Sequence, residues 1–251
     1  MEILISNDDG IDSNGLFELA NKFKELGNVT VVAPLQQMSA TSHSLTTITP
    51  LRIKHFYRNN KFFGYAVNGT PADCVKLAII SLMDKKPDIV ISGINYGRNT
   101  GINILYSGTI AAAVEGFLMG IPSFAVSLTT HNTKKEAATA AEYAFQIVQK
   151  ILKEKITENL ILNINIPAIP AENIKGIKIT KLANSYWDDK YEKRVDTFHQ
   201  EYYWFNGKYI YDKENIKTDD AVIEEGYIAV TPLQYSFTNY QQMEILKILE
   251  R

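Results

Sequence analysis

Asp8 and Asp9 are the first residues of the chain whose types and spacing could do chemistry. They follow the apolar run from Ile3 to Ile5 and precede Gly10. Adjacent carboxylates repel each other unless a cation or a proton lies between them. A short apolar run is typical of a buried parallel strand, and ligands of open α/β sheets bind beyond the carboxyl ends of such strands. The pair therefore indicates a metal site, with a solvated acidic turn as the alternative.

A polar loop rich in Ser and Thr, residues 36–47, follows the second predicted strand. Its hydroxyl groups are suited to act as hard oxygen ligands or as hydrogen-bond donors to phosphate. His43 in this loop is a candidate acid or electrostatic stabiliser. The alternative is a flexible surface loop with a solvated histidine.

A second loop rich in Gly and Asn, residues 95–101, follows the predicted strand at residues 87–93. Its glycines would allow the backbone to approach a ligand closely, and its asparagines offer neutral oxygen ligands. Ser107, Gly108 and Thr109 then open an Ala-rich helix predicted from Ile110 to Leu118. Free N–H groups at a helix start form a natural phosphate site, although an ordinary serine cap would look the same.

The elements that position these residues alternate between strand and helix up to residue 167. The first strand, a helix capped by Ser13 or Asn14, and a strand from Val29 to Ala33 form a βαβ unit, which predicts a parallel sheet. Thr70 followed by Pro71 predicts a helix start. The fold class expected is α/β, with a mostly parallel sheet covered by helices on both faces. Further strands are expected at 51–56, 62–67, 122–128 and 160–166, and a further helix at 133–155.

Composition bounds the possible functions. The chain has 251 residues and a formal net charge of −2, which offers no basic footprint for nucleic acid or an anionic membrane. Its single cysteine, Cys74, and four histidines exclude a disulfide framework and a Cys-rich zinc site, and Cys74 is expected in the core. No apolar stretch is long enough to span a bilayer, so a soluble, cytoplasmic protein is expected.

The pattern changes beyond residue 168. A strand is predicted from Ile174 to Leu182, another from Gly226 to Val230, and a final helix from about Asn239 to Leu249. Between them, residues 185–212 hold both tryptophans and many tyrosines. We expect this segment to be an arm that packs on a neighbouring subunit, with a hairpin folded on its own domain as the alternative. The expected organisation is one domain, 1–251, with a core at 1–167 and a C-terminal region at 168–251 that contains the arm.

Taken together, these motifs closely resemble the SurE family, the stationary-phase survival proteins that act as 5′/3′-nucleotidases. The resemblance runs nearly end to end and in order. Its matching stretches are Ser6–Gly10, Ser39–Thr46, Gly69–Cys74, Ser92–Asn99, Tyr106–Thr109, Asn163–Pro167, Glu225–Tyr227 and Thr231–Leu233.

This resemblance implies a Rossmann-like fold and one divalent cation held by Asp8, Asp9, Ser39 and Asn95. Oxygen ligands without His or Cys favour Mg²⁺ or Mn²⁺. The reaction expected is hydrolysis of nucleoside 5′- or 3′-monophosphates, in which Asp8 or Asp9 orients a water or accepts its proton. Asn95 and the helix start formed by Ser107, Gly108 and Thr109 would hold the phosphate.

The resemblance also implies a homodimer or homotetramer with exchanged C-terminal segments. Position 43 varies in the family, so His43 is not expected to be indispensable. Two other functions fit the acidic pair, namely a phosphotransferase with Asp8 as nucleophile and a non-catalytic protein that binds metal and nucleotide. A receiver-like signalling module fits less well with 251 residues and the Ser/Thr loop.

Overall fold

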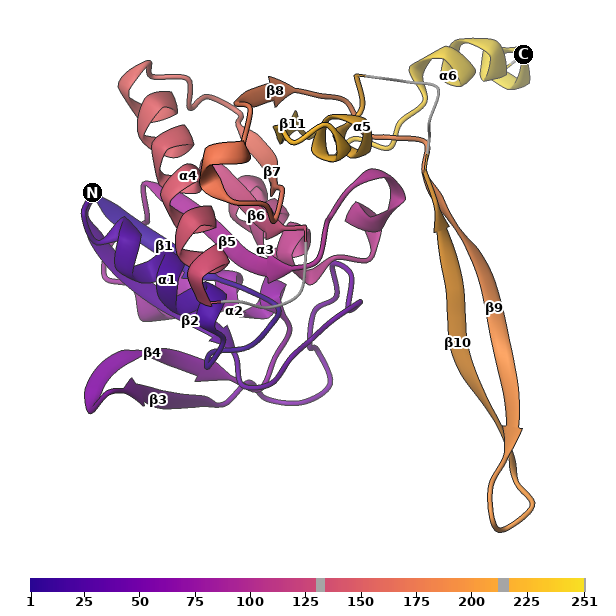
Figure 1. Ribbon diagram of the computed structural model, residues 1–251, viewed down its shortest axis with the longest axis horizontal. Coiled ribbons are helices and arrows are strands. Elements are labelled where there is room, and N and C mark those ends of the chain that lie inside the picture. The colour runs from indigo at the N-terminus through magenta and orange to yellow at the C-terminus, as the bar shows by residue number, and fades with distance from the viewer. Residues whose placement is uncertain (130–133, 212–216, 251) are drawn as a thin grey trace.

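The computed structural model describes residues 1–129, 134–211 and 217–250. Its body is built on one large, mostly parallel sheet, as expected (Figure 1). The described strands of this sheet lie in the order β3-β4-β2-β1-β5-β6-β7-β11-β8. The central strands are β1 (Glu2–Ser6), β2 (Asn28–Pro34), β5 (Ile89–Tyr96), β6 (Ser123–Leu128) and β7 (Ile161–Ile166).

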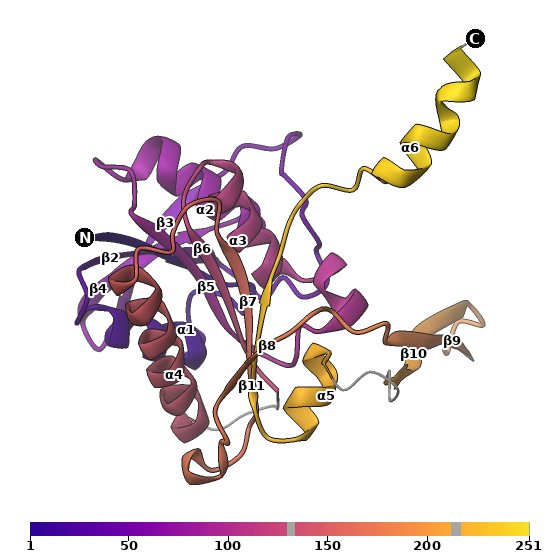
Figure 2. The same cartoon turned by 90° about the horizontal axis from the view of Figure 1, so that it is seen from above.

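Helices cover both faces of this sheet (Figure 2). Helices α1 (Asn14–Phe23) and α4 (Lys134–Lys153) pack together on one face. Helices α2 (Pro71–Leu77), which continues as a π-helical turn, and α3 (Gly108–Leu118) pack together on the other. Because both faces are covered, the central strands are apolar along nearly their whole length.

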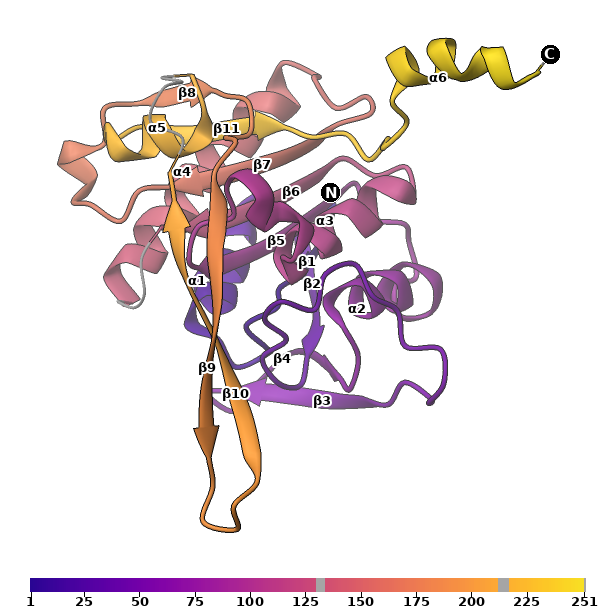
Figure 3. The same cartoon turned by 90° about the vertical axis from the view of Figure 1, so that its right-hand side faces the viewer.

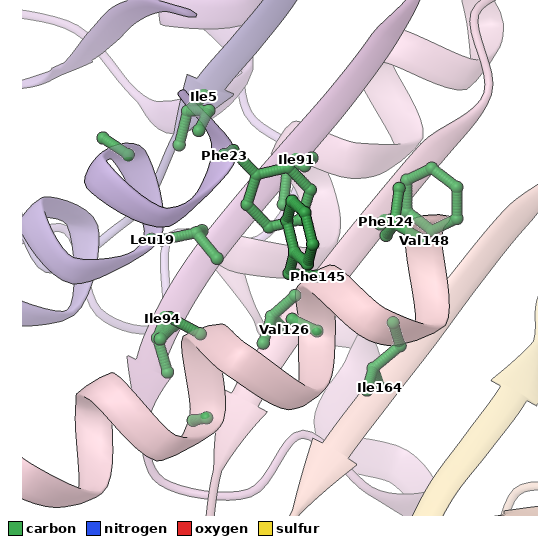
Figure 4. Close-up of a cluster of buried hydrophobic side chains, with 14 of the residues drawn as sticks. Ile5, Leu19, Phe23, Ile91, Ile94, Phe124, Val126, Phe145, Val148 and Ile164 are labelled. Carbon is green, nitrogen blue, oxygen red and sulfur yellow. The ribbon is translucent and has the colours of Figure 1, made fainter. Parts of the chain in front are cut away.

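The larger core cluster lies between the sheet and helices α1 and α4 (Figure 4). Phe23 of α1 meets Phe145 of α4 edge to face, with ring centroids 5.6 Å apart. Ile91 and Val126 contribute from the neighbouring strands β5 and β6. Cys74 lies buried in the cluster on the opposite face, and burial raises the pKa of its thiol, so it is a core residue as expected.

Local signals in the sequence explain where several elements begin. Ser13 caps α1 by accepting a hydrogen bond from the backbone N–H of Leu16. Thr70 and Asp73 form a capping box at the start of α2. The strands expected at 51–56 and 62–67 are β3 (Ile53–Arg58) and β4 (Lys61–Val67). They pair in a hairpin whose turn residues Asn59 and Asn60 adopt positive φ.

The C-terminal region departs from the predicted boundaries. The strand expected from Ile174 to Leu182 is only β8 (Ile177–Ile179), because an edge strand can pair only where its one neighbour runs beside it. That neighbour, β11 (Ile228–Pro232), lies antiparallel to β7 and parallel to β8. The sequence predicted a strand at this place, from Gly226 to Val230, but not that it would run antiparallel to β7. The start of the predicted helix at Thr133 lies outside the described residues.

Two segments project from the body (Figures 1 and 3). Strands β9 (Tyr186–Val195) and β10 (Glu201–Ile210) pair with each other in a long antiparallel hairpin, which we call the arm. Helix α6 (Tyr240–Leu246) and a following 3-10 turn (Lys247–Glu250) are exposed on all sides. Among the helices that the structure describes, none has the length and apolar character needed to cross a bilayer. The division into a core and a C-terminal region stays a prediction.

Candidate functional site

Four of the predicted site residues line a single pocket of about 560 Å³. Asp8 comes from the turn after β1, Ser39 from the polar loop after β2, Asn95 from β5, and Ser107 from the start of α3. The first three follow from topology, because β1, β2 and β5 are adjacent parallel strands whose carboxyl ends share one edge. The structure therefore brings together residues that are up to 99 positions apart in the sequence, from 8 to 107.

Asp8 is almost fully buried against the start of α3. Its Oδ1 accepts a hydrogen bond of 2.5 Å from the Thr109 hydroxyl. Burial raises the pKa of Asp8, and hydrogen bonds from the side chain and backbone of Thr109 and from the backbone of Gly108 oppose that rise. A Cβ on Gly108 would lie 2.7 Å from the Cβ of Asp8, so only glycine permits this approach.

Asp9 and Ser39 are linked by the side chain of Gln37. Its Nε2 donates to Ser39 Oγ at 2.9 Å and, more weakly, to Asp9 Oδ1 at 3.4 Å. The other Asp9 oxygen accepts from the backbone N–H of Tyr96 at 3.3 Å. Burial and repulsion from Asp8 raise the pKa of Asp9 to about 6. Asp8 and Asp9 therefore place two mutually repelling carboxylates at one site, and a bound cation would relieve that repulsion.

Asn95 lies where the pairing of β5 with β6 slips between Ser92 and Asn95. Gly93 makes this slip possible, because it adopts a φ of 136° and a Cβ there would lie 2.3 Å from the carbonyl oxygen of Val126. The Asn95 amide nitrogen donates to the carbonyl of Gly97 at 2.8 Å. Its side-chain oxygen is the atom left for a ligand.

This donor set fits a hard divalent cation. Two carboxylates, one hydroxyl and one amide oxygen are the ligand types that Mg²⁺ and Mn²⁺ prefer. In the part of the chain that the structure describes, no group of three or more His, Cys, Asp or Glu side chains is placed to hold a metal. Neutral oxygen donors such as Ser39 and Asn95 therefore have to complete any site at Asp8 and Asp9.

The predicted phosphate site at the start of α3 is only partly free. Ser107 lines the pocket, although its hydroxyl also caps the helix by accepting from the N–H of Ile110 at 3.2 Å. The Thr109 hydroxyl is committed to Asp8, and Gly108 packs against the same carboxylate. In this structure Thr109 supports Asp8, and its direct contact with phosphate stays a prediction.

His43 does not line this pocket and instead contacts the buried side chain of Glu115. Its Nε2 is 2.8 Å from Oε2 of Glu115, and Lys76 donates to the other Glu115 oxygen at 2.5 Å. These contacts lower the pKa of Glu115, with His43 as the largest cause. The loop that carries Ser39 is thereby tied to helices α2 and α3. This contact gives His43 a structural role, and the Glu115 side chain that it meets is buried.

Sequence reasoning missed the side chains that support the Gly- and Asn-rich loop. Asn163 and Asn165 of β7 both donate to the carbonyl of Asn99, and the Asn165 oxygen accepts from the Asn99 N–H at 2.9 Å. A signal was present, since two asparagines at alternate positions interrupt an otherwise apolar strand. It also missed Trp187, Tyr209 and Tyr211 as lining of the pocket.

Comparison with known proteins agrees with this architecture. The model of the family described as "Survival protein SurE" matches residues 3–189. A "5'-nucleotidase SurE" of Chlorobium phaeobacteroides is 45% identical over 245 residues, covering 98% of this chain and 95% of the relative. One of Syntrophobacter fumaroxidans is 39% identical over 246 residues, covering 98% of both chains.

The crystal structure of a SurE protein from Aquifex aeolicus superposes with a TM-score of 0.85 at 39% identity, with complete coverage of both chains. Agreement in sequence and fold thus extends over the acidic turn, the polar loop and the start of α3. On this evidence, the chain belongs to the SurE family.

Proposed function

We propose that this protein is a divalent-metal-dependent phosphomonoesterase that hydrolyses nucleoside monophosphates to nucleoside and phosphate. The observation that carries the proposal is the convergence of Asp8, Ser39, Asn95 and Ser107 on one pocket. Its relatives are named 5′-nucleotidases, which supports the same activity here.

Asp8, Asp9, Ser39 and Asn95 are the proposed metal ligands, with Mg²⁺ or Mn²⁺ as the proposed ion. When bound, the cation neutralises phosphoryl oxygens and lowers the pKa of a water molecule. Asp8 is held in place by Thr109 and Gly108, so it can orient a water without moving. Asp9 is the less tightly held carboxylate, which suits it to accept a proton.

Ser107 and Asn95 are the proposed phosphate contacts. Both line the pocket beside Asp8, and the positive end of the α3 dipole favours an anion there. Holding the phosphate between the helix start and Asp8 would align it with the attacking water and stabilise charge as it develops.

The activity is tested by measuring phosphate released from AMP with Mg²⁺ or Mn²⁺, with and without EDTA. We expect turnover that EDTA abolishes and that either cation restores. Binding of AMP without any phosphate release would instead support a non-catalytic protein. Trapping of a phosphorylated Asp8 would support the phosphotransferase.

We also propose that the protein is a homodimer or homotetramer with exchanged C-terminal segments. The arm and α6 carry large apolar side chains in the open, among them Trp204 at 59% exposure and Leu249 at 77%. Surfaces of this kind are typical of subunit interfaces. The cytoplasmic location expected from the sequence stays a prediction.

A further inference from the structure

The pocket extends beyond the predicted ligands to the base of the arm. Asp8, Asn95 and Ser107 line it at the sheet edge, while Trp187 of β9 and Tyr209 of β10 line it where the arm leaves the body. Trp187 and Tyr209 face each other across the hairpin, with ring centroids 5.3 Å apart. One cavity therefore combines a set of oxygen ligands with flat aromatic surfaces.

The two aromatic rings are held by their polar ends. The Trp187 Nε1–H donates to Asn103 Oδ1 at 2.7 Å. The Tyr209 hydroxyl donates to Asp220 Oδ2 at 2.9 Å, and burial raises the pKa of Tyr209 to about 12. The rings are thus oriented by hydrogen bonds to the body.

Trp187 differs from the exposed aromatic side chains of the outer arm because it borders the pocket that Asp8 lines. An aromatic pair that only anchored the arm would be expected to bury its faces against the body. Trp187 is instead 41% exposed and borders the pocket. A phosphate group gains nothing from an apolar ring, whereas a nucleobase stacks on one through its π face.

We propose that Trp187 and Tyr209 form the nucleobase subsite of this pocket and stack the base of a nucleoside monophosphate whose phosphate lies at Asp8 and Ser107. This inference rests on the proposed nucleotidase function and deepens it, because it assigns the residues that favour nucleotides over other phosphate esters. Stacking tolerates every base. The enzyme should therefore discriminate strongly between phosphate esters with and without a base, and only weakly between nucleotides with different bases.

The kinetic test compares AMP with ribose 5-phosphate, which carries the same phosphate and sugar without the base. For Trp187→Ala we expect KM for AMP to rise about tenfold while KM for ribose 5-phosphate stays unchanged. Trp187→Phe should restore most of the affinity for AMP. Phe198→Ala, at the exposed tip of the arm, is the control and should alter neither substrate.

A binding test without catalysis uses the fluorescence of Trp187. Trp204→Phe leaves Trp187 as the single tryptophan of the chain. We expect adenosine to quench its emission with saturation, and ribose to leave it unchanged. The same titration on Trp187→Phe, Trp204→Phe reports the background.

The outcomes separate the two proposals. An enzyme that releases phosphate from neither ester contradicts the nucleotidase function, and adenosine quenching then still decides the subsite. Equal loss of both substrates in Trp187→Ala, or an unchanged KM for AMP, would overturn the subsite while leaving the nucleotidase function standing. Absence of saturable quenching by adenosine would overturn it as well.

Discussion

At the scale of single residues, the site places two carboxylates where burial and mutual repulsion disfavour their charged forms. Asp8 is buried and Asp9 lies beside it, and the pKa of both carboxyl groups is raised. A cation relieves both burial and repulsion at once, so the arrangement favours metal binding. The Thr109 hydroxyl donates a hydrogen bond to Asp8, and the Gln37 side chain and the Tyr96 backbone N–H donate to Asp9.

Asp8→Asn and Asp9→Asn are each expected to lower phosphatase activity roughly a hundredfold or more, because the cation contributes several kcal/mol to the transition state. The exposed Asp12 on the same turn provides the control, and Asp12→Asn should retain activity. Initial rates in limiting Mn²⁺, with circular dichroism to verify the fold, make the measurement. Near-normal turnover by either site variant would show that its carboxylate is no ligand.

Glu115 carries a prediction about stability and pH. Its side chain is 4% exposed and contacts both Lys76 and His43. Glu115→Gln should lower the free energy of unfolding at pH 7 by about 1–3 kcal/mol.

The pKa of Glu115 is lowered in the folded state, so its stabilisation is full above the ordinary value of 4.5 and is lost as pH falls through the folded pKa. The difference between the wild type and Glu115→Gln should therefore shrink with acidification. Urea unfolding at pH 7 and in the acidic range measures it. A difference that stays constant would assign the effect to packing rather than to charge.

At the scale of elements, the start of α3 serves two tasks at once. Gly108 and Thr109 position Asp8, while Ser107 caps the helix and faces the pocket. A substitution at Ser107 therefore has both a structural and a ligand-binding effect, and an experiment has to separate them.

Ser107→Ala is expected to weaken binding of inorganic phosphate and AMP more than binding of Mn²⁺, because the hydroxyl faces the anion. Loss of the cap should also cost about 1 kcal/mol of stability. Ser107→Thr should restore both properties. Thr218→Ala removes the comparable cap of α5 (Asp219–Glu224) and should leave phosphate binding unchanged. Calorimetric titration provides both affinities, and equal loss of metal binding would show that Ser107 lies at the cation.

At the scale of the whole molecule, the arm joins two proposed roles in one hairpin. Its base lines the pocket, and its outer part projects away from the body (Figure 1). Isolated two-stranded hairpins are marginally stable in water, so the outer part is expected to gain its stability from a partner subunit.

Asp189 and Gly207 pair across the arm, so an Asn-Gly turn that replaces residues 190–206 would connect two residues that are already neighbours. Trp187 and Tyr209 stay in place, so the pocket is kept while the outer arm is lost. We expect mostly smaller assemblies, because each deletion removes contacts from both partners of a symmetric interface. Light scattering measures the result, and an unchanged oligomer would contradict the exchanged arm.

The sequence by itself determined much of the core and the composition of the site. Apolar runs of strand length and the Thr70–Pro71 helix start are local signals, and the core strands and the helix α2 that they predict are present. The rule that parallel strands end at one edge was enough to bring Asp8, Ser39 and Asn95 together. Local propensity depends only on neighbours along the chain, and the rule for parallel strands needs only the alternation of strands and helices that the sequence shows.

Only the tertiary structure decided how distant segments meet. The antiparallel insertion of β11 beside β7 depends on contacts between residues more than 60 positions apart. The commitment of the Thr109 hydroxyl to Asp8, the burial of Glu115 against His43 and Lys76, and the place of Trp187 and Tyr209 in the pocket arise from packing across elements. Such contacts leave no local pattern, because their energy comes from the partner that folding brings near.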